Sequence, residues 1–326
     1  MAALPQPARV ETIDLGHVRG GEIEELLREE MDVWRQRLYW DFSSSADLVE
    51  RFVDMRALQG CALRVGGQLA GYSYYVCEEH KGLVGDLYVR HAYATPDHER
   101  ALLHATVTTL ARQPGVRRIE SQLLMYRDSR PAGPHFPLAS QVQEFPRLFM
   151  LLDLTAIDLF APGRASNRFL LDRWDERRSD EASQLISDSY RHHIDSHIND
   201  QYRSPSGARR FLMNIVQYPG CGTFQESASC IALDASSRQF SGLCLTSIVC
   251  PGIGHITQLC TADAVRGEGL GYEMLRYSLQ GLRRVGCQSV TLTVTAANVE
   301  AVRLYERFGF QVLKRFSAHV WEGFRA

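Results

Sequence analysis

The stretch Val265-Arg266-Gly267-Glu268-Gly269-Leu270-Gly271 decides the fold of the second half of this chain. Apolar residues alternate over residues 255–261, which predicts a strand, and recur at helical spacing over residues 272–285, which predicts a helix. The three glycines allow the main chain to approach a ligand closely, and the first N–H groups of a helix lack partners within it. The order strand, glycine turn, helix therefore predicts an anion-binding turn whose natural occupant is a phosphate.

Two other glycine-rich phosphate sites fit this stretch poorly. A P-loop ends in Gly-Lys-Ser/Thr, whereas Tyr272 and Glu273 follow Gly271, so a lysine for the terminal phosphate and a hydroxyl for magnesium are both missing. A dinucleotide fold expects an acidic residue at the end of the next strand, which here ends in Thr295-Ala296-Ala297-Asn298. The remaining pattern, a basic residue followed by Gly-x-Gly spacing, resembles the acyl-CoA pyrophosphate loop of the GNAT N-acetyltransferase superfamily.

The resemblance extends on both sides of the glycine turn. The run Leu259-Cys260-Thr261-Ala262-Asp263-Ala264-Val265-Arg266-Gly267 is similar to the family's Leu-x-Val-x-Pro-x-x-Arg-Gly, with Thr261 and Asp263 departing at the Val and Pro positions. Residues 298–309 (NVEAVRLYERFG), followed by Phe310, resemble the family's Asn-x-x-Ala-x-x-Leu-Tyr-x-x-x-Gly-Phe. The match is detailed over residues 254–320 and looser from Arg168 onward. It implies acetyl-CoA as co-substrate and requires no metal.

Composition indicates an ordinary globular chain. A length of 326 residues favours two domains, and the formal net charge of -2 leaves no basic surface for nucleic acid. No apolar run approaches the ~20 residues of a membrane-spanning helix, and residues 1–11 lack the apolar core of a signal peptide. The 8 cysteines never form C-x-x-C, which favours reduced, buried thiols over disulfides or zinc. We therefore expect a cytoplasmic protein without membrane partners, and the oligomeric state stays open.

Two copies of one fold are expected, because Leu87-Tyr88-Val89 lines up with Leu259-Cys260-Thr261 and a helix follows each. We predict an α/β (α+β) protein of two tandem GNAT-like domains, residues 1–160 and 161–326, joined near Ala161-Pro162-Gly163-Arg164-Ala165-Ser166. Each domain is expected to be a mixed, mostly antiparallel twisted sheet flanked by helices. The expected strands are 10–15, 61–65, 71–76, 83–89, 117–125, 148–154, 169–174, 229–233, 241–249, 255–261 and 289–295, and the expected helices are 21–37, 98–112, 180–199, 206–216, 272–285 and 299–308.

The two copies differ at the anion-binding turn. In this alignment Arg266, Gly269 and Gly271 correspond to Ala94, Asp97 and Glu99. The first copy thus replaces two glycines by carboxylates that repel a phosphate and block its approach, and a proline at position 96 removes one N–H donor. We expect the first domain to be a degenerate copy that does not bind CoA, and the second to be catalytic.

The resemblance implies a coenzyme site along one strand and the turn. Main-chain N–H groups and the helix N-terminus are expected to bind the pyrophosphate, with the Arg266 guanidinium as a further contact. The strand is expected to splay from its neighbour, so that Leu259 and Thr261, which flank Cys260, pair with the pantetheine arm. A main-chain N–H near Leu259 then stabilises the oxyanion that forms when an amine attacks the thioester. The turn residues in this set are Arg266, Gly267, Glu268, Gly269, Leu270 and Gly271.

Asn298 and Tyr305 each have a structural and a functional interpretation. Asn298 is a good N-cap for the helix that follows it, and its family counterpart also bonds the pantetheine. Tyr305 shares an apolar helical face with its neighbours, so it could be a packed core residue. Its family counterpart donates a proton to the departing thiolate as general acid, and we adopt that role for Tyr305.

The general base has three candidates. His255 on the strand before the turn is the first choice, since its unperturbed pKa suits proton transfer near neutrality. Glu226 is the second choice and Asp263 the third. Each is equally explicable as a structural, surface or capping residue.

The acceptor is expected to meet the segment 189–202, which contains His192, His193 and His197. His193 and His197 lie four residues apart, so one helical face could present both to a metal, but without a third ligand a hydrogen-bonded pair is preferred. Asp188, Asp195 or Asp200 could receive an ammonium group. We therefore predict an N-acyltransferase that moves an acetyl group from acetyl-CoA to a primary amine, namely a small polar amine, an amino sugar or a peptide N-terminus. The alternative is a non-catalytic acyl-CoA sensor or interaction module.

Overall fold

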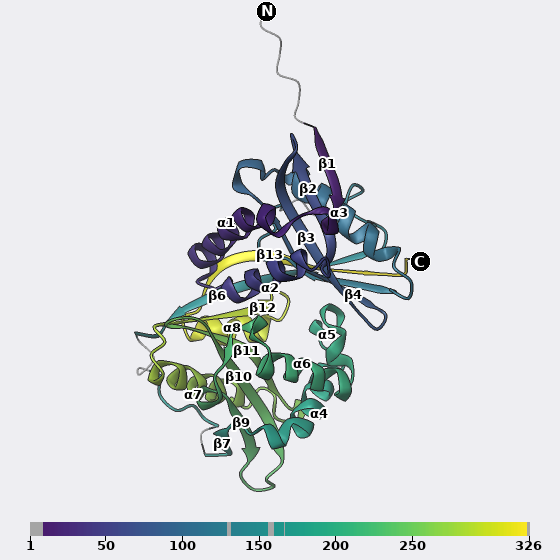
Figure 1. Ribbon diagram of the computed structural model, residues 1–326. Coiled ribbons are helices and arrows are strands. Elements are labelled where there is room, and N and C mark those ends of the chain that lie inside the picture. Colours follow the sequence, from purple (N-terminus) through teal and green to yellow (C-terminus); the bar gives the residue numbers. More distant parts are fainter. Residues whose placement is uncertain (1–8, 129–131, 156–159, 166, 325–326) are drawn as a thin grey trace, which may run out of the picture. The chain divides into compact units, whose positions relative to one another are not determined.

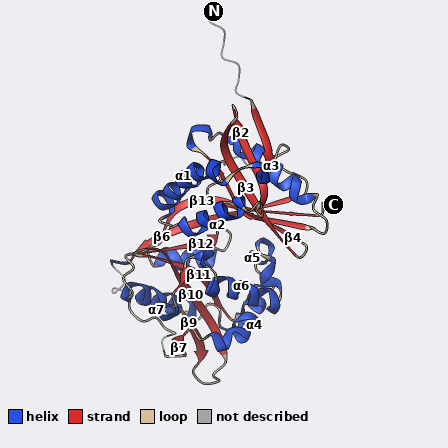
Figure 2. Ribbon diagram, in the orientation of Figure 1, coloured by secondary structure: helices blue, strands red, loops and turns tan. Residues whose placement is uncertain are grey.

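Contacts divide the chain into two units. The computed structural model describes residues 9–128, 132–155, 160–165 and 167–324 (Figure 1). Unit 1 comprises Met1–Leu38, Phe42–Phe145 and Phe316–Ala326, and unit 2 comprises Tyr39–Asp41 and Pro146–Arg315. Each unit is a twisted sheet flanked by helices, as Figure 2 shows by secondary structure. The predicted α/β class with two tandem copies is therefore confirmed.

Unit 1 is a mostly antiparallel sheet in the order β1-β2-β3-β4-β5-β13, and only β4 and β5 pair in parallel. Helix α3 buries apolar side chains against β2, β3 and β4. The elements of this half of the chain are β1 (Val10–Asp14), α1 (Gly20–Leu38), α2 (Ser43–Asp54), β2 (Gln59–Val65), β3 (Gln68–Glu78), β4 (Lys81–Val89), α3 (Pro96–Ala111), β5 (Arg118–Gln122) and β13 (Gln311–Glu322).

Unit 2 repeats this plan with the order β6-β12-β11-β10-β9-β7, and β8 pairs with β10. Again only one pair, β11 with β12, is parallel. Its elements are β6 (Val142–Asp153), β7 (Phe169–Arg173), α4 (Ser179–Tyr190), α5 (Asp195–Ile198), α6 (Pro205–Gln217), β8 (Thr223–Phe224), β9 (Cys230–Asp234), β10 (Phe240–Cys250), β11 (Ile253–Thr261), α7 (Leu270–Arg284), β12 (Ser289–Thr295) and α8 (Val299–Arg307).

Successive side chains of β10 show which helices cover each face of the sheet in unit 2. Leu243 and Leu245 pack in a core with α4 and α6, whereas Cys244 between them packs in a core with α7 and α8. Since successive side chains of a strand point to opposite faces, these helix pairs cover opposite faces of the sheet. In Figure 1, α7 lies on one side of this sheet and α4 and α6 lie on the other.

The last strand of each half of the chain pairs with the other half. Strand β6 follows β5 in sequence but pairs antiparallel with β12, and β13 follows α8 but pairs antiparallel with β5. The unit boundaries consequently fall inside β6 and β13. The sequence instead predicts a joint at residues 161–166, of which residue 166 lies outside the described residues. The difference arises because periodicity identifies a strand but not its partner.

Two further expectations differ from the structure. The helix predicted over residues 180–199 is wrong, because α4 ends at Tyr190 and a turn separates it from α5. The Arg266 guanidinium donates to the Ser189 carbonyl at 2.6 Å, so a residue distant in sequence takes the acceptor that a continuing helix would use. The second difference is α2, which sequence periodicity did not identify.

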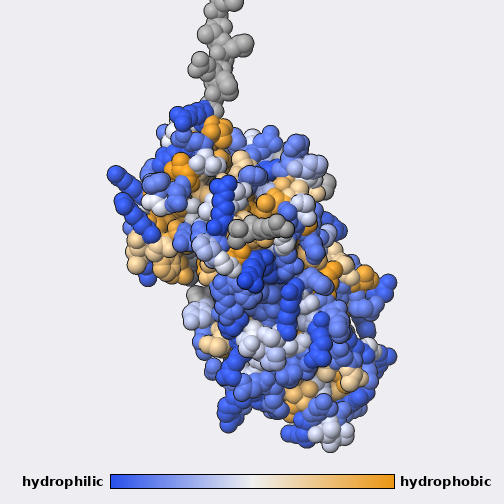
Figure 3. All heavy atoms as spheres, turned by 90° about the vertical axis from the view of Figure 1, so that its right-hand side faces the viewer, coloured by the Kyte–Doolittle hydropathy of each residue, from blue (hydrophilic) through white to orange (hydrophobic). Residues whose placement is uncertain are grey.

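The surface is predominantly polar where Figure 3 displays it. Hydrophilic residues cover most of that face, with smaller groups of apolar residues between them. Over the described ranges, no helix combines the length and the apolar character needed to cross a membrane.

Candidate active site

The glycine turn forms an open helix N-terminus in unit 2. Gly269 is the N-cap of α7 with φ of 96°, and no side chain caps the helix there. Gly267 also has a positive φ, of 75°. Both conformations strain any residue with a Cβ, which explains why glycine occupies these positions. The first N–H groups of α7 are therefore left for a ligand.

The sheet opens beside this turn. Strands β11 and β12 pair in parallel only from Ile253 to Ile256, whereas β10 stays paired with β11 as far as Thr261. The Ala262 N–H donates to the Ser241 carbonyl at 2.8 Å, so Ala262 faces β10. Because main-chain groups of an antiparallel strand alternate between its two sides, those of Leu259 and Thr261 face the open side. The Ser189 hydroxyl donates to the Thr261 carbonyl at 3.0 Å, and the main-chain groups of Leu259 stay open next to the helix N-terminus.

A pocket of about 820 Å³ runs along this opening. It joins the strand, the glycine turn and the start of α8 in a single cavity. The sequence-predicted residues that line it are Leu259, Cys260, Thr261, Arg266, Gly267, Gly269, Leu270, Gly271 and Asn298. Two predicted residues, Glu268 and Tyr305, are adjacent to this lining without being part of it.

Charges around the turn are largely paired. Arg266 forms an ion pair with Asp263 at 2.8 Å in addition to its bond to Ser189. Glu268 would repel an anion, but it forms an ion pair with Arg168. Its charge is thereby offset where the ligand phosphate is expected.

Sequence reasoning missed Arg164, which also lines the pocket. Its guanidinium donates to the carbonyls of Gly267 and Glu268, the latter at 3.3 Å. These bonds fasten residues 160–165 to the outside of the turn, together with the Tyr272 hydroxyl, which donates to the Ala161 carbonyl at 3.0 Å. The only signal in the sequence was a basic residue within the expected linker.

Asn298 caps α8, with its Oδ1 accepting the Ala301 N–H at 3.2 Å. Its Nδ2 lies 3.1 Å from Nε2 of His193, which lines the same pocket. His193 Nδ1 accepts the Asp195 N–H at 3.2 Å. Burial lowers the pKa of His193 below that of a free imidazole, and the neighbouring Asp195 carboxylate opposes this shift in part. Asn298 therefore connects the start of α8 to His193 within the lining of the pocket.

The expectation that His193 and His197 share one helical face is wrong, because the chain turns between α4 and α5 and only His197 lies on a helix. Within the described part of the chain, no group of three or more His, Cys, Asp or Glu side chains has the arrangement of a metal site. His193 instead packs edge-on against Tyr190, with ring centroids 5.0 Å apart.

Tyr305 lies on the buried face of α8 with 8% of its surface exposed. Its ring packs edge-on against Phe310 at 5.8 Å, and its hydroxyl has no hydrogen-bond partner among the described residues. Burial, followed by the nearby Cys244 thiol, raises the pKa of Tyr305 well above its usual value. Cys244 is opposite Leu259 in the β10–β11 register. A protonated hydroxyl is thus available near the strand residue at the open side of the sheet.

The candidate bases do not gather around this pocket. His255 on β11 is 8% exposed, and its Nδ1 lies 2.8 Å from the Thr291 hydroxyl oxygen. Trp40 packs against its ring at 5.1 Å. Burial lowers the pKa of His255 to about 4. Asp263 is engaged by Arg266.

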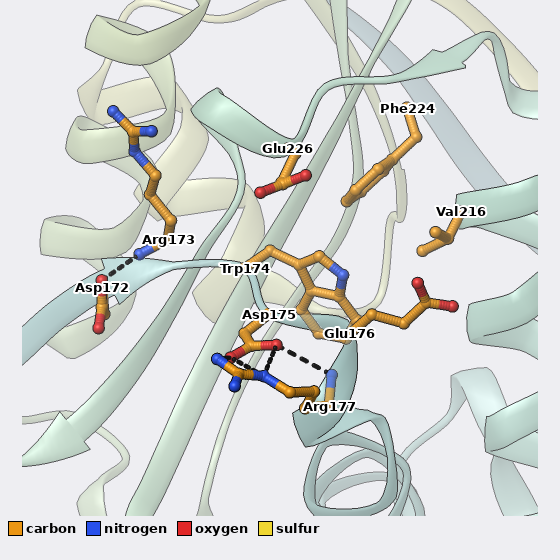
Figure 4. Close-up of a pocket in the computed structure, with 9 residues that line it drawn as sticks. All are labelled: Asp172, Arg173, Trp174, Asp175, Glu176, Arg177, Val216, Phe224 and Glu226. Carbon is orange, nitrogen blue, oxygen red and sulfur yellow. Dashed lines mark hydrogen bonds and ion pairs between the residues drawn. The ribbon is translucent and has the colours of Figure 1, made fainter.

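Glu226 lies at a second pocket of about 570 Å³ in unit 2, drawn in Figure 4. In this view the carboxylate of Glu226 and the ring of Phe224 both lie above the Trp174 indole, and Phe224 packs edge-on against it with ring centroids 6.4 Å apart. No residue of this pocket belongs to the lining of the pocket at the glycine turn. The structure therefore separates Glu226 from Leu259 and Thr261.

The corresponding region of unit 1 is closed by side chains. The hydroxyl of Thr95 accepts the His98 N–H at 3.1 Å and so caps α3, unlike the uncapped start of α7. The Glu99 carboxylate is buried and accepts the N–H groups of Arg127 at 2.8 Å and Asp128 at 3.0 Å. Where unit 2 has glycine and open N–H donors, unit 1 has a buried, bonded carboxylate.

The glycine turn, the sheet that opens beside it and the single pocket along both have the form expected of a site for an extended ligand with a phosphate at one end. The sequence profile of the acetyltransferase (GNAT) family matches residues 194–310. This match lies within the second unit of the chain.

Solved structures share the tandem fold. A GCN5-related N-acetyltransferase from Sphaerobacter thermophilus matches with a TM-score of 0.65 and 17% identity, over 98% of this chain and 97% of its own. A tandem GNAT protein from the clavulanic acid biosynthesis pathway matches with a TM-score of 0.59 and 14% identity, over 96% of this chain and 98% of its own. These identities establish likeness of fold only.

Relatives by sequence match shorter segments. A mycothiol acetyltransferase from Corynebacterium jeikeium is 37% identical over 60 residues, which is 18% of this chain and 17% of that protein. A spermine/spermidine N(1)-acetyltransferase from Bacillus subtilis is 43% identical over 50 residues, which is 15% of this chain and 33% of that protein. This chain thus matches only a third or less of the length of either relative.

Proposed function

We propose that the chain is an N-acetyltransferase that moves an acetyl group from acetyl-CoA directly to a primary amine in unit 2. One observation carries the proposal: the open side of β11, with Leu259 and Thr261, continues into the uncapped N-terminus of α7 within a single pocket. The names of the relatives, acetyltransferases of mycothiol and of spermine or spermidine, support an acetyl group and an amine-type acceptor.

The turn supplies the binding energy for the pyrophosphate. The N–H groups of Gly267, Gly269, Leu270 and Gly271 and the positive end of α7 attract the charge, because those of Arg266 and Glu268 donate within the turn to Asp263 and Val265. Glu268 does not oppose the ligand, since Arg168 pairs with it. The pantetheine arm pairs with Leu259 and Thr261 as an additional strand would. Cys260 points to the opposite face and packs with α4 and α6, so it holds the strand rather than the ligand.

The acyl end is served by a donor on the strand and a donor on α8. The Leu259 N–H stabilises the oxyanion that forms when the amine attacks the thioester carbonyl. Tyr305 then donates its proton to the leaving thiolate, whose pKa lies near that of free cysteine at ~8.5. The raised pKa of Tyr305 supports this role, since the hydroxyl stays protonated at neutral pH. Asn298 holds the start of α8, and therefore Tyr305, against the pocket.

His255 remains the first candidate base and Glu226 the second. Neutral His255 can accept a proton from the amine. Because burial destabilises the imidazolium that results, the ring must then release this proton to water. An alanine variant at each position, followed over pH, tests the assignments. Replacing the true base by alanine should shift or remove the acidic limb of the profile of kcat/KM against pH. Replacing the other residue should leave this limb unchanged.

Unit 1 is proposed to be a degenerate copy without coenzyme. The Glu99 carboxylate, bonded to the N–H groups of Arg127 and Asp128, takes the position that Gly271 has in unit 2, and Thr95 caps the helix whose N-terminus would face the phosphate. We therefore propose that unit 1 has a supporting role and that unit 2 carries the catalytic site.

Thiol release from acetyl-CoA tests the proposal. The acceptor panel consists of spermidine, glucosamine and a dipeptide with a free N-terminus, one for each class of amine considered. Release of CoA that depends on one of these amines, with a matching acetylated product by mass spectrometry, supports the transferase. Binding of acetyl-CoA without turnover across amines from all three classes would favour the sensor instead.

A further inference from the structure

The charged residues that line the pocket at the glycine turn are not all neutralised. Arg266 is paired with Asp263, and Arg303 is paired with Glu300 at 3.3 Å. Arg164 and Arg307 have no acidic partner in the part of the chain that the structure describes. The pocket therefore keeps two uncompensated positive charges.

Arg164 is held in place by the turn itself. Two of its N–H groups are used by the carbonyls of Gly267 and Glu268, which are neutral and leave the charge intact. A Cβ built on Gly269 would lie 3.4 Å from the Arg164 Cγ, so the side chain lies directly against the N-cap of α7. A guanidinium has five N–H donors, and those that remain are available to a ligand.

Arg307 contacts the same helix start through Tyr272. Its guanidinium carbon is 4.7 Å from the centroid of the Tyr272 ring, and the Tyr272 hydroxyl bonds to Ala161 in the segment that carries Arg164. This cation–π contact orients the side chain without consuming its charge or its donors. Arg164 and Arg307 therefore both line the pocket and both contact the first turn of α7, Arg164 at Gly269 and Arg307 at Tyr272.

We propose that Arg164 and Arg307 form a subsite for a phosphate monoester, the 3′-phosphate that coenzyme A carries on its ribose. The inference rests on the proposed function, which places the pyrophosphate on the adjacent N–H groups. A phosphate monoester carries a charge of about −1.5 to −2 at pH 7, which matches two guanidiniums. Guanidinium donors suit such a group because they bind its oxygens in pairs. The subsite makes this chain selective for coenzyme A over 3′-dephospho-coenzyme A.

Calorimetric titration of the full-length protein with each of the two coenzymes tests the subsite. We expect coenzyme A to bind about 30-fold more tightly than the dephospho form, since charge-assisted hydrogen bonds contribute on this scale. Arg164→Gln and Arg307→Gln each lower this preference to about fivefold, and the double variant abolishes it. The ratio isolates the 3′-phosphate, because a disturbed turn weakens both ligands alike. The preference also falls as salt is raised.

Arg303→Gln is the matched control, because Arg303 is one helical turn before Arg307 and its charge is already offset by Glu300. It should keep the full preference for coenzyme A. Equal wild-type affinity for the two ligands, equal weakening of both by the variants, or loss of the preference in Arg303→Gln would each overturn the subsite while leaving the proposed function intact. Absence of coenzyme A binding by the wild type would instead remove the proposed function, and the subsite with it.

Discussion

Replacing Tyr305 with Phe removes one hydroxyl and leaves the packing in place. The ring keeps its contact with Phe310, and the hydroxyl has no partner among the described residues, so the free energy of unfolding should change by less than about 0.5 kcal/mol. If the hydroxyl protonates the departing thiolate, its loss lowers kcat about a hundredfold, equivalent to about 2.7 kcal/mol in the barrier. The Kd for acetyl-CoA should not change, because the ground-state ligand does not need the proton.

The assay combines thiol release with calorimetric binding of acetyl-CoA. Tyr277→Phe is the control, since it removes a tyrosine hydroxyl from α7 that does not line the pocket at the glycine turn. Because burial raises the pKa of Tyr305, wild-type kcat should not decline through loss of this proton at pH ~10, the usual tyrosine pKa. An unchanged kcat in Tyr305→Phe, or an equal loss in Tyr277→Phe, would refute the role of Tyr305 as general acid.

Three further predictions concern the turn and unit 1. Gly269→Ala should weaken coenzyme binding at least about tenfold and lower the free energy of unfolding by about 1 kcal/mol. Gly286 has a similar φ of 94° with open space around it, so Gly286→Ala should lower the stability alone. Equal coenzyme binding by the two variants would contradict this. Glu99→Ala should destabilise unit 1 by about 2 kcal/mol in denaturant unfolding without creating a second coenzyme site, and a stoichiometry of two would contradict the argument. Glu30 shares a buried site with Asp86, and burial raises the pKa of both carboxyl groups, that of Asp86 to about 6. The contribution of the pair to stability is therefore greatest below the unfolded-state pKa of ~4 and falls as pH rises through the folded-state values. Glu30→Gln should therefore reduce the fall in unfolding free energy between pH 5 and pH 8 by about 1 kcal/mol, and an unchanged pH dependence would contradict it.

Local patterns in the sequence predicted most elements of the fold. The strand expected over residues 289–295 is found as Ser289–Thr295, because alternation there reflects burial within the sheet. The glycine turn was interpretable for a similar reason, since positive φ angles at Gly267 and Gly269 are a local requirement for glycine.

Features that depend on distant residues could not be predicted. The break after Tyr190 depends on Arg266, which lies far along the chain. The pairing of β6 with β12 and of β13 with β5 depends on a choice among strands with similar patterns. Arg164 was overlooked because its place in a linker says nothing about the carbonyls that it contacts.

The candidate site shows the same division between local and distant information. Residues on consecutive segments, such as Leu259 and Gly269, line one pocket because the strand leads directly into the turn. The proposed bases required knowledge of tertiary placement. His255 is buried against Thr291, and Glu226 lies at a separate pocket. A side chain chosen for its intrinsic pKa carries no information about where the fold places it.

A crystal structure of the full chain with coenzyme A tests the central claim most directly. The account predicts one coenzyme per chain, with its pyrophosphate on the N–H groups of residues 266–271 and its pantetheine along Leu259 and Thr261. Coenzyme bound at residues 94–99 of unit 1, or at neither turn, would contradict it.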